Sequence, residues 1–194
     1  MAGYEVLLCV CGGIAAYKTC EVASRLVQHG AGVTVAMTRS ARRFVGMATY
    51  QALTGRRVLT SLWHRSSPED GDHIGITNRA DLIILAPATA NIIGKMAGGI
   101  ADDLVSTIAL SADSPILIAP AMNDRMWEHP IVTENVRKLA DIGIHMVGPD
   151  AGWLACRSVG AGRMSDADAI IPRAVELLVA NPAKTTAASG VTKQ

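Results

Sequence analysis

Three side chains that could do acid–base or hydrogen-bonding chemistry stand where the sequence passes from regular patterns into loops. His73 follows a stretch without clear periodicity, Asn123 follows an apolar run that ends in Pro120, and Cys156 lies in a glycine-rich segment. An imidazole can move a proton near neutral pH, an amide can bind a carboxylate, and a thiol can donate a proton. A surface position for His73 and a helix-cap or turn role for Asn123 remain open on spacing alone.

A second group of residues could hold a phosphate. Gly12 and Gly13 end an apolar run and precede a helical pattern. Glycine lets a ligand approach the main chain, and a helix N-terminus presents N–H groups to an anion. The dinucleotide fingerprint Gly-x-Gly-x-x-Gly is absent, and residues 38–40 (Thr-Arg-Ser) stand where a ribose-binding acid would be expected. These hydroxyls and this cation favour a single phosphate monoester.

A central strand leads to a third candidate turn. Residues 82–86 form an unbroken apolar run, typical of a strand buried on both faces of a parallel sheet, and Pro87 is expected to end its hydrogen-bond ladder. Thr89 or Asn91 can cap a helix that begins near Ile92, leaving unpaired N–H groups at the carboxyl edge of the sheet. Ligands of open α/β sheets bind at that edge, although an ordinary strand–turn–helix connection also fits this stretch taken alone.

Alternating strand and helix patterns must position these residues. Apolar runs predict strands over residues 6–11, 33–37, 82–86, 115–119 and 144–147. Helical patterns cover residues 14–29, 41–53, 101–112, 133–142 and 167–179, besides the helix from about residue 92. We therefore predict an α/β fold over residues 1–180: a single Rossmann-like (flavodoxin-like), doubly wound parallel sheet in three α/β/α layers. The turns after residues 86 and 119 should lie side by side.

Several segments lack this regularity. Residues 56–72 predict a loop with a short strand at Val58, His73 is expected to lie on a loop, and residues 126–130 predict a turn. Residues 148–164 are so rich in glycine that ordering them is costly without a function, and loops of this length are often lids. Residues 181–194 have the composition of a disordered tail.

Composition narrows the class of protein. The 194 residues suit one domain, and 49% hydrophobic residues with 4% aromatics imply an aliphatic core. A net charge of +1 argues against nucleic-acid or membrane binding as the main activity. No apolar stretch reaches about 18 residues and no signal-peptide pattern begins the chain, so a cytoplasmic location is expected. The four cysteines form neither a disulfide framework nor a zinc-ligand pattern, so no metal is expected.

Several short motifs, taken in order, resemble those of the phosphopantothenoylcysteine decarboxylases, which belong to the homo-oligomeric flavin-containing cysteine decarboxylases. They are Gly-Gly-Ile-Ala-Ala-Tyr-Lys at 12–18, His-Ile at 73–74, Pro-Ala-Thr-Ala-Asn at 87–91, Pro-Ala-Met-Asn-Asp-Arg-Met-Trp at 120–127, and Ala-Cys with Gly-Ala-Gly-Arg-Met at 155–164. The resemblance spans roughly residues 5–178. In bacteria such a decarboxylase is often fused to a ligase, and here the resemblance implies the decarboxylase half only.

The resemblance implies FMN as the cofactor and assigns residues to it. Those expected around the FMN phosphate and ribityl chain are Gly12, Gly13, Ile14, Thr38 and Ser40. Those expected around the rest of the flavin are Thr89, Ala90, Asn91 and Ala121. Those expected at the substrate are Asn123, Met122, Leu154 and Ala155.

The resemblance also implies catalytic roles. His73 matches the active-site histidine, Asn123 the residue that holds the substrate carboxylate, and Cys156 the proton donor on a flexible flap. The family flap commonly reads Ala-Cys-Gly-Asp or Ala-Cys-Gly-Glu, whereas Arg157 and Ser158 follow the cysteine here. This departure bears on the geometry of the flap and on the ionisation of the thiol.

The implied reaction is the FMN-dependent decarboxylation of 4'-phosphopantothenoylcysteine to 4'-phosphopantetheine in coenzyme A biosynthesis. Direct loss of carbon dioxide from a cysteine carboxylate would leave an unstabilised carbanion. Oxidation of the thiol-bearing carbon, with His73 or the flavin handling the proton, gives a thioaldehyde that acts as an electron sink, and decarboxylation then gives an enethiol. Return of hydride, with a proton from Cys156, makes the net reaction non-oxidative.

Other functions share parts of this pattern. A peptidyl-cysteine decarboxylase of peptide-antibiotic maturation would have the same fold, cofactor, histidine and asparagine. A non-catalytic flavin-binding regulatory subunit would not need His73, Asn123 and Cys156 together, and a flavin prenyltransferase would have no evident use for the histidine and the cysteine. The family builds its active site between subunits of a trimer, so we expect a homotrimer or a multiple of trimers, in which His73 could face the flavin of a neighbour.

Overall fold

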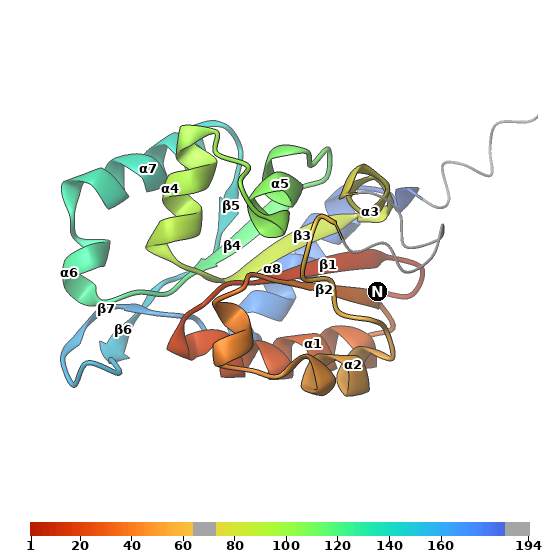
Figure 1. The fold of residues 1–194 in the computed structure, drawn as a ribbon, viewed down its shortest axis with the longest axis horizontal. Coiled ribbons are helices and arrows are strands. Elements are labelled where there is room, and N and C mark those ends of the chain that lie inside the picture. The colour runs from red at the N-terminus through yellow and green to blue at the C-terminus, as the bar shows by residue number, and fades with distance from the viewer. Residues whose placement is uncertain (64–72, 185–194) are drawn as a thin grey trace, which may run out of the picture.

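The computed structural model describes residues 1–63 and 73–184, and Figure 1 shows a parallel sheet between two layers of helices. The strands are β1 (Glu5–Val10), β2 (Gly32–Met37), β3 (Leu82–Ala88), β4 (Ile116–Pro120) and β5 (His145–Met146). Their order is β2-β1-β3-β4-β5, and each neighbouring pair is parallel. This is the flavodoxin-like order, so the predicted fold class is confirmed.

Helices cover both faces of the sheet because the central strands are apolar on both faces. Along β1, Leu8 packs into one core and Leu7 into the other, as successive side chains of a strand must. The first core lies under η1 (Ile14–Lys18), α1 (Thr19–Gln28), α2 (Met47–Thr54) and α8 (Ala167–Ala180). The second lies under α3 (His73–Arg79), α4 (Ala90–Gly98), α5 (Leu104–Leu110) and α7 (Pro130–Asp141).

The central strand does not end where the sequence predicted. β3 runs through Pro87 to Ala88, past a cis Ala86–Pro87 bond, and its register against β4 shifts between Leu85 and Ala88. The proline lacks an N–H, but the strand resumes pairing beyond it. Helix α4 then begins at Ala90, two residues before the predicted start. As predicted, the turns after β3 and β4 are neighbours, since the backbone N–H of Ala121 donates to the Ala88 carbonyl at 3.0 Å.

Several helix boundaries also differ from the prediction. The single helix predicted over residues 41–53 is divided into η2 (Ala41–Arg43) and α2, with the extended Gly46 as the N-cap of α2. The helix predicted from residue 101 begins at Leu104 because Asp103 and Ser106 form a capping box. The loop predicted around His73 is the helix α3, and part of the turn predicted over residues 126–130 is the short helix α6 (Asp124–Trp127).

The largest correction concerns residues 148–164, which were predicted as a long loop. They contain an antiparallel hairpin of β6 (Asp150–Trp153) and β7 (Val159–Arg163). In Figure 1 this hairpin extends from the end of the sheet at which the carboxyl ends of the strands lie, near α6. The sequence gives little sign of these strands because the less exposed positions of the hairpin are glycine and alanine: Gly152, Gly160, Ala161 and Gly162.

The structure describes part of each of two segments that the sequence left without regular structure, residues 56–72 and residues 181–194. Leu59 forms a parallel bridge with Ala36 next to the short strand predicted at Val58, while residues 64–72 lie outside the described residues. Lys184 contacts the domain, since its backbone N–H donates to Asp81 Oδ1 at 2.7 Å and its Nζ to Ser114 Oγ at 2.8 Å. Lys184, in the tail predicted from residue 181, thus contacts residues of the domain, and residues 185–194 lie outside those described. In the described part of the chain, no helix is long and apolar enough to cross a membrane.

Candidate active site

The carboxyl ends of β1 and β3 meet at the point where the chain direction around the sheet reverses. Such switch points are where open α/β sheets bind ligands. The turn after β1 and the turn after β3 are in contact, because a Cβ added to Gly13 would lie 3.5 Å from Thr89 Cγ2 and 3.9 Å from Pro87 Cγ. The two turns that the sequence predicted as ligand-binding therefore form one surface.

The turn after β2 joins the same surface through a close backbone approach. A Cβ added to Gly12 would lie 2.3 Å from Ser40 Cβ, so glycine is required there to let the two turns touch. The hydroxyl of Thr38 accepts a hydrogen bond from the N–H of Ala41, the first residue of η2, at 3.2 Å, whereas Ser40 is exposed. Of the two hydroxyls predicted to face a phosphate, that of Ser40 is the more accessible.

This surface fits a group that carries one phosphate. Gly13 precedes η1 and Thr89 precedes α4, and neither N-cap makes a side-chain capping bond. The first N–H groups of a helix have no partner within the helix, so both starts can donate to an anion or to a polar ring edge. Ile14, 59% exposed, adds apolar surface beside them. The remaining predicted contacts lie close by: Ala90 opens α4, Asn91 follows it, and Ala121 bonds to Ala88.

The β6–β7 hairpin is held against the turn after β4. The Met122 N–H donates to the Gly162 carbonyl at 3.0 Å. A Cβ on Gly162, whose φ is +138°, would lie 2.3 Å from the Met122 carbonyl oxygen, and a Cβ on Gly160 would lie 2.8 Å from Asp124 Cβ. These two glycines therefore let β7 reach the turn that carries Asn123, which explains why so glycine-rich a segment is ordered.

The hairpin tip presents Cys156 to solvent. Leu154, which is buried, donates its N–H to the Ser158 carbonyl at 2.9 Å, and the Arg157 N–H donates to the Leu154 carbonyl at 2.9 Å. Arg157 has a left-handed φ of +66°. This is the three-residue hairpin loop whose last residue is left-handed and usually glycine. Arginine thus occupies the strained position where the resembling family commonly has glycine, and Ala155 and Cys156 are exposed.

The structure brings Asn123 and Cys156 together. Asn123 Nδ2 donates to Cys156 Sγ at 3.0 Å, while its Oδ1 caps α6 by accepting from the Arg125 N–H at 2.9 Å. Ser158 Oγ lies 3.1 Å from the sulfur. Hydrogen bonds from Ser158, and then from Asn123, hold the pKa of the Cys156 thiol below its usual value, against the opposing effects of burial and of the Asp124 carboxylate.

Two residues at this site were given no role by the sequence. Ser158 lies where the sequence departs from the family pattern, and Lys18 is the last residue of the motif at 12–18. Lys18 Nζ donates to the Met164 carbonyl at 3.0 Å and lies 2.6 Å from Asp166 Oδ1, so it ties η1 to the base of the hairpin. A half-buried lysine after a glycine turn carries no local signal of its partner, because that partner is 148 residues away in the sequence.

His73 is placed elsewhere. It is the first residue of α3, whose Ile76 packs with Leu7 near the start of β1. In Figure 1, α3 and the β6–β7 hairpin lie at opposite ends of the sheet. Within one chain, the helix that His73 begins is therefore not beside Cys156.

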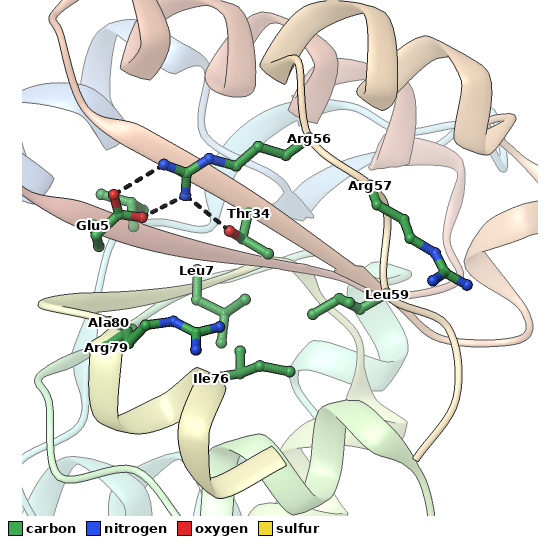
Figure 2. Close-up of a pocket in the computed structure, with 10 residues that line it drawn as sticks. Glu5, Leu7, Thr34, Arg56, Arg57, Leu59, Ile76, Arg79 and Ala80 are labelled. Carbon is green, nitrogen blue, oxygen red and sulfur yellow. Dashed lines mark hydrogen bonds and ion pairs between the residues drawn. The ribbon is translucent and has the colours of Figure 1, made fainter. Parts of the chain in front are cut away.

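A cavity of about 300 Å³ lies at the amino end of the sheet, near α3. Figure 2 shows that Leu7, Leu59 and Ile76 line it with the guanidinium of Arg79, while Arg56 and Glu5 form an ion pair at its edge, with Arg56 Nη2 2.9 Å from Glu5 Oε1. None of the predicted site residues lines this cavity. It is separate from the surface formed by the three turns and the hairpin.

Comparisons with known proteins agree with this arrangement. The family model described as Flavoprotein matches residues 1–179. The coenzyme A biosynthesis bifunctional protein CoaBC of Bacillus subtilis is 50% identical over 167 residues, which are 86% of this chain and 41% of that protein. The chain thus spans less than half the length of the curated relatives that it matches first.

Two solved structures share the fold over most of their length. A cysteine-to-serine variant of PPC decarboxylase complexed with pantothenoylaminoethenethiol has a TM-score of 0.77 and 29% identity, covering 91% of this chain and 98% of that one. The FMN-dependent cysteine decarboxylase SpaF has a TM-score of 0.74 and 32% identity, covering 89% and 98%. With the family model matching nearly all of the described residues, this chain belongs to the flavoprotein family.

Proposed function

We propose that this chain catalyses the FMN-dependent decarboxylation of 4'-phosphopantothenoylcysteine to 4'-phosphopantetheine in coenzyme A biosynthesis. The observation that carries the proposal is the contact of Asn123 with Cys156 beside the ligand-binding edge, because a carboxylate-binding amide and a proton-donating thiol are needed at the same carbon. CoaBC and PPC decarboxylase support the substrate, and SpaF supports the cofactor.

FMN would supply, when bound, the reversible two-electron chemistry that lets a cysteine carboxylate leave as carbon dioxide without an unstabilised carbanion. The N–H groups after Gly13 and the exposed hydroxyl of Ser40 suit its phosphate and ribityl chain, with Gly12, Ile14 and Thr38 beside them. Thr89, Ala90, Asn91 and Ala121 would surround the rest of the flavin.

The reacting groups come from the neighbouring turn and the hairpin. Asn123 Nδ2 would bind the substrate carboxylate and orient the bond that breaks. Cys156 would donate the proton that replaces the carboxylate, and the exposed tip would let solvent restore that proton. Met122, Leu154 and Ala155 would line the substrate, and His73 would accept or hold the proton released when the thiol-bearing carbon is oxidised.

We also propose that the chain works as a homotrimer or a multiple of trimers in the cytoplasm. Helix α3 lies at the other end of the sheet from Cys156, so His73 would serve a site formed with a neighbouring copy. Native mass spectrometry tests this directly: a monomer as the active species would contradict it. A trimer mixed from His73→Asn and Cys156→Ser chains should recover part of the lost activity if the site is shared between copies.

The central test is product analysis by mass after incubating the flavin-loaded protein with 4'-phosphopantothenoylcysteine. Equal amounts of carbon dioxide and 4'-phosphopantetheine are expected. His73→Asn should keep its flavin but form no product, and Cys156→Ser should accumulate the enethiol. Full turnover by either variant would remove that residue from the mechanism.

The same assay decides between substrates. A peptide that ends in cysteine tests the reaction of peptide-antibiotic maturation, which the relatives named for coenzyme A biosynthesis do not favour. Faster decarboxylation of the peptide than of the coenzyme A precursor would overturn the proposed substrate.

A further inference from the structure

The amide nitrogen of Asn123 carries two N–H bonds, and one of them is directed at a thiol. Its Oδ1 is held by the Arg125 N–H at 2.9 Å as the cap of α6, and this fixes the plane and direction of the side chain. Its Nδ2 is directed at Cys156 Sγ, 3.0 Å away. A substrate carboxylate bound to the N–H that faces the sulfur would take the place that the sulfur occupies here.

We infer that the N–H of Asn123 Nδ2 that faces Cys156 binds two partners in succession: first the substrate carboxylate, then, once carbon dioxide has left, the Cys156 thiol. The inference rests on the proposed function. The carbon that needs a proton is the one that lost the carboxylate. The thiol must therefore be brought to the place that the carboxylate has left, and Asn123 is the residue that binds each group there. The exchange therefore delivers the proton donor only after decarboxylation.

The proton transfer balances at this position. The two electrons of the broken carbon–carboxylate bond remain on the substrate as an enethiolate. The S–H bond of Cys156 breaks, a C–H bond forms at the carbon that lost the carboxylate, and the negative charge moves to Cys156 Sγ. Asn123 Nδ2–H and the Ser158 hydroxyl, 3.1 Å from the sulfur, stabilise that thiolate. A bound reduced flavin would supply the hydride that the adjacent sulfur-bearing carbon then needs.

The hairpin has more contacts with the rest of the chain at its base than at its tip. The base is held by the bond from Met122 to Gly162 and by Lys18 on Met164 and Asp166. At the tip, Ala155 and Cys156 are exposed, and across the gap to the β4 turn the thiol is held by Asn123. Withdrawal of a single hydrogen bond thus releases the thiol without undocking β7.

The test removes the carboxylate from the assay. The enethiol collected from Cys156→Ser is given to flavin-loaded protein that has been reduced chemically, and flavin reoxidation and 4'-phosphopantetheine are measured. Asn123→Ser keeps an oxygen that can cap α6 but is too short to reach the sulfur. We expect it to reduce the enethiol at least tenfold more slowly than the unmodified protein. His129→Ser, which replaces the N-cap side chain of α7 in the same way, should react at the unmodified rate.

The outcomes separate the two proposals. If the unmodified protein neither decarboxylates 4'-phosphopantothenoylcysteine nor reduces the enethiol, the proposed function fails. If it does both, and Asn123→Ser reduces the enethiol at the unmodified rate, the exchange is refuted, because a residue that only binds a carboxylate has no role with a substrate that lacks one. Asn123→Asp, which keeps the cap oxygen and loses the donor, should also be slow, and this guards against a misfolded variant.

Discussion

The approach of β7 to the turn after β4 should decide whether Cys156 can act, and Gly162→Ala tests it. The new Cβ would lie 2.3 Å from the Met122 carbonyl oxygen, so the strand must withdraw by about 0.7 Å to reach the 3.0 Å that real Cβ atoms keep. That withdrawal weakens the bond from Met122 to Gly162, worth about 1 kcal/mol. A φ of +138° costs a residue other than glycine about 1–3 kcal/mol more.

Together these effects should weaken hairpin docking by about 3 kcal/mol, which lowers the ratio of docked to undocked hairpin about 100-fold. Hydrogen exchange over residues 150–163 should speed up, and 4'-phosphopantetheine formation should fall more than carbon dioxide release does. Flavin affinity should not change, because the turns after β1, β2 and β3 are untouched.

Gly152→Ala is the matched control inside the same hairpin. Its added Cβ would meet nothing closer than Arg163 Cδ at 3.6 Å, which is ordinary contact. Exchange and product formation in this variant should resemble those of the unmodified protein. If Gly162→Ala behaves like Gly152→Ala, then the close approach of β7 does not hold the thiol in place, and the reasoning from these distances is wrong.

Three further predictions concern the same hairpin. Arg157→Gly should raise the free energy of unfolding by about 0.5 kcal/mol, because relief of the left-handed backbone exceeds the entropy that glycine adds to the unfolded chain, and a lower melting temperature would contradict this. Ser158→Ala should raise the pKa of Cys156. Since the thiol must carry its proton to donate it, activity falls as pH rises through that pKa, and the alkaline limb of the pH–rate profile should move to higher pH in the variant; an unmoved limb would exclude Ser158 as the cause. Lys18→Met should weaken docking of the hairpin base by about 1 kcal/mol, visible as faster exchange near Met164.

Much of the fold was predictable because it depends on local patterns. The unbroken apolar runs of β1, β3 and β4 are characteristic of strands with helices on both faces, and the alternation of strands with helices leaves few topologies. The errors occurred where a tertiary contact outweighed a local rule. β3 continues past Pro87 because β4 lies beside it, and residues 150–163 form a hairpin because β7 packs on the turn at Met122.

Part of the candidate site could be predicted from local patterns, and part depends on tertiary contacts. Turns that follow parallel strands lie at the same edge of a sheet. The proximity of Gly13, Ser40 and Thr89 could therefore be predicted from their positions after successive strands. The spatial neighbours of Cys156 could not be predicted from the sequence, because a hairpin can extend from the edge of a sheet in many directions. Ser158 carried no signal as a partner of the thiol, and the place of His73 depended on a helix that the sequence predicted as a loop.

What the sequence determined by itself was the layered fold, the edge of the sheet at which the candidate ligand-binding turns lie and the kinds of chemical group available there, since these depend on hydrophobic periodicity and on the position of turn residues. What only the tertiary structure decided was that Asn123 and Cys156, 33 residues apart, share a hydrogen bond. The physical reason is close packing. Gly160 and Gly162 let β7 contact the turn after β4, and no local sequence pattern indicates which segment will pack against a glycine.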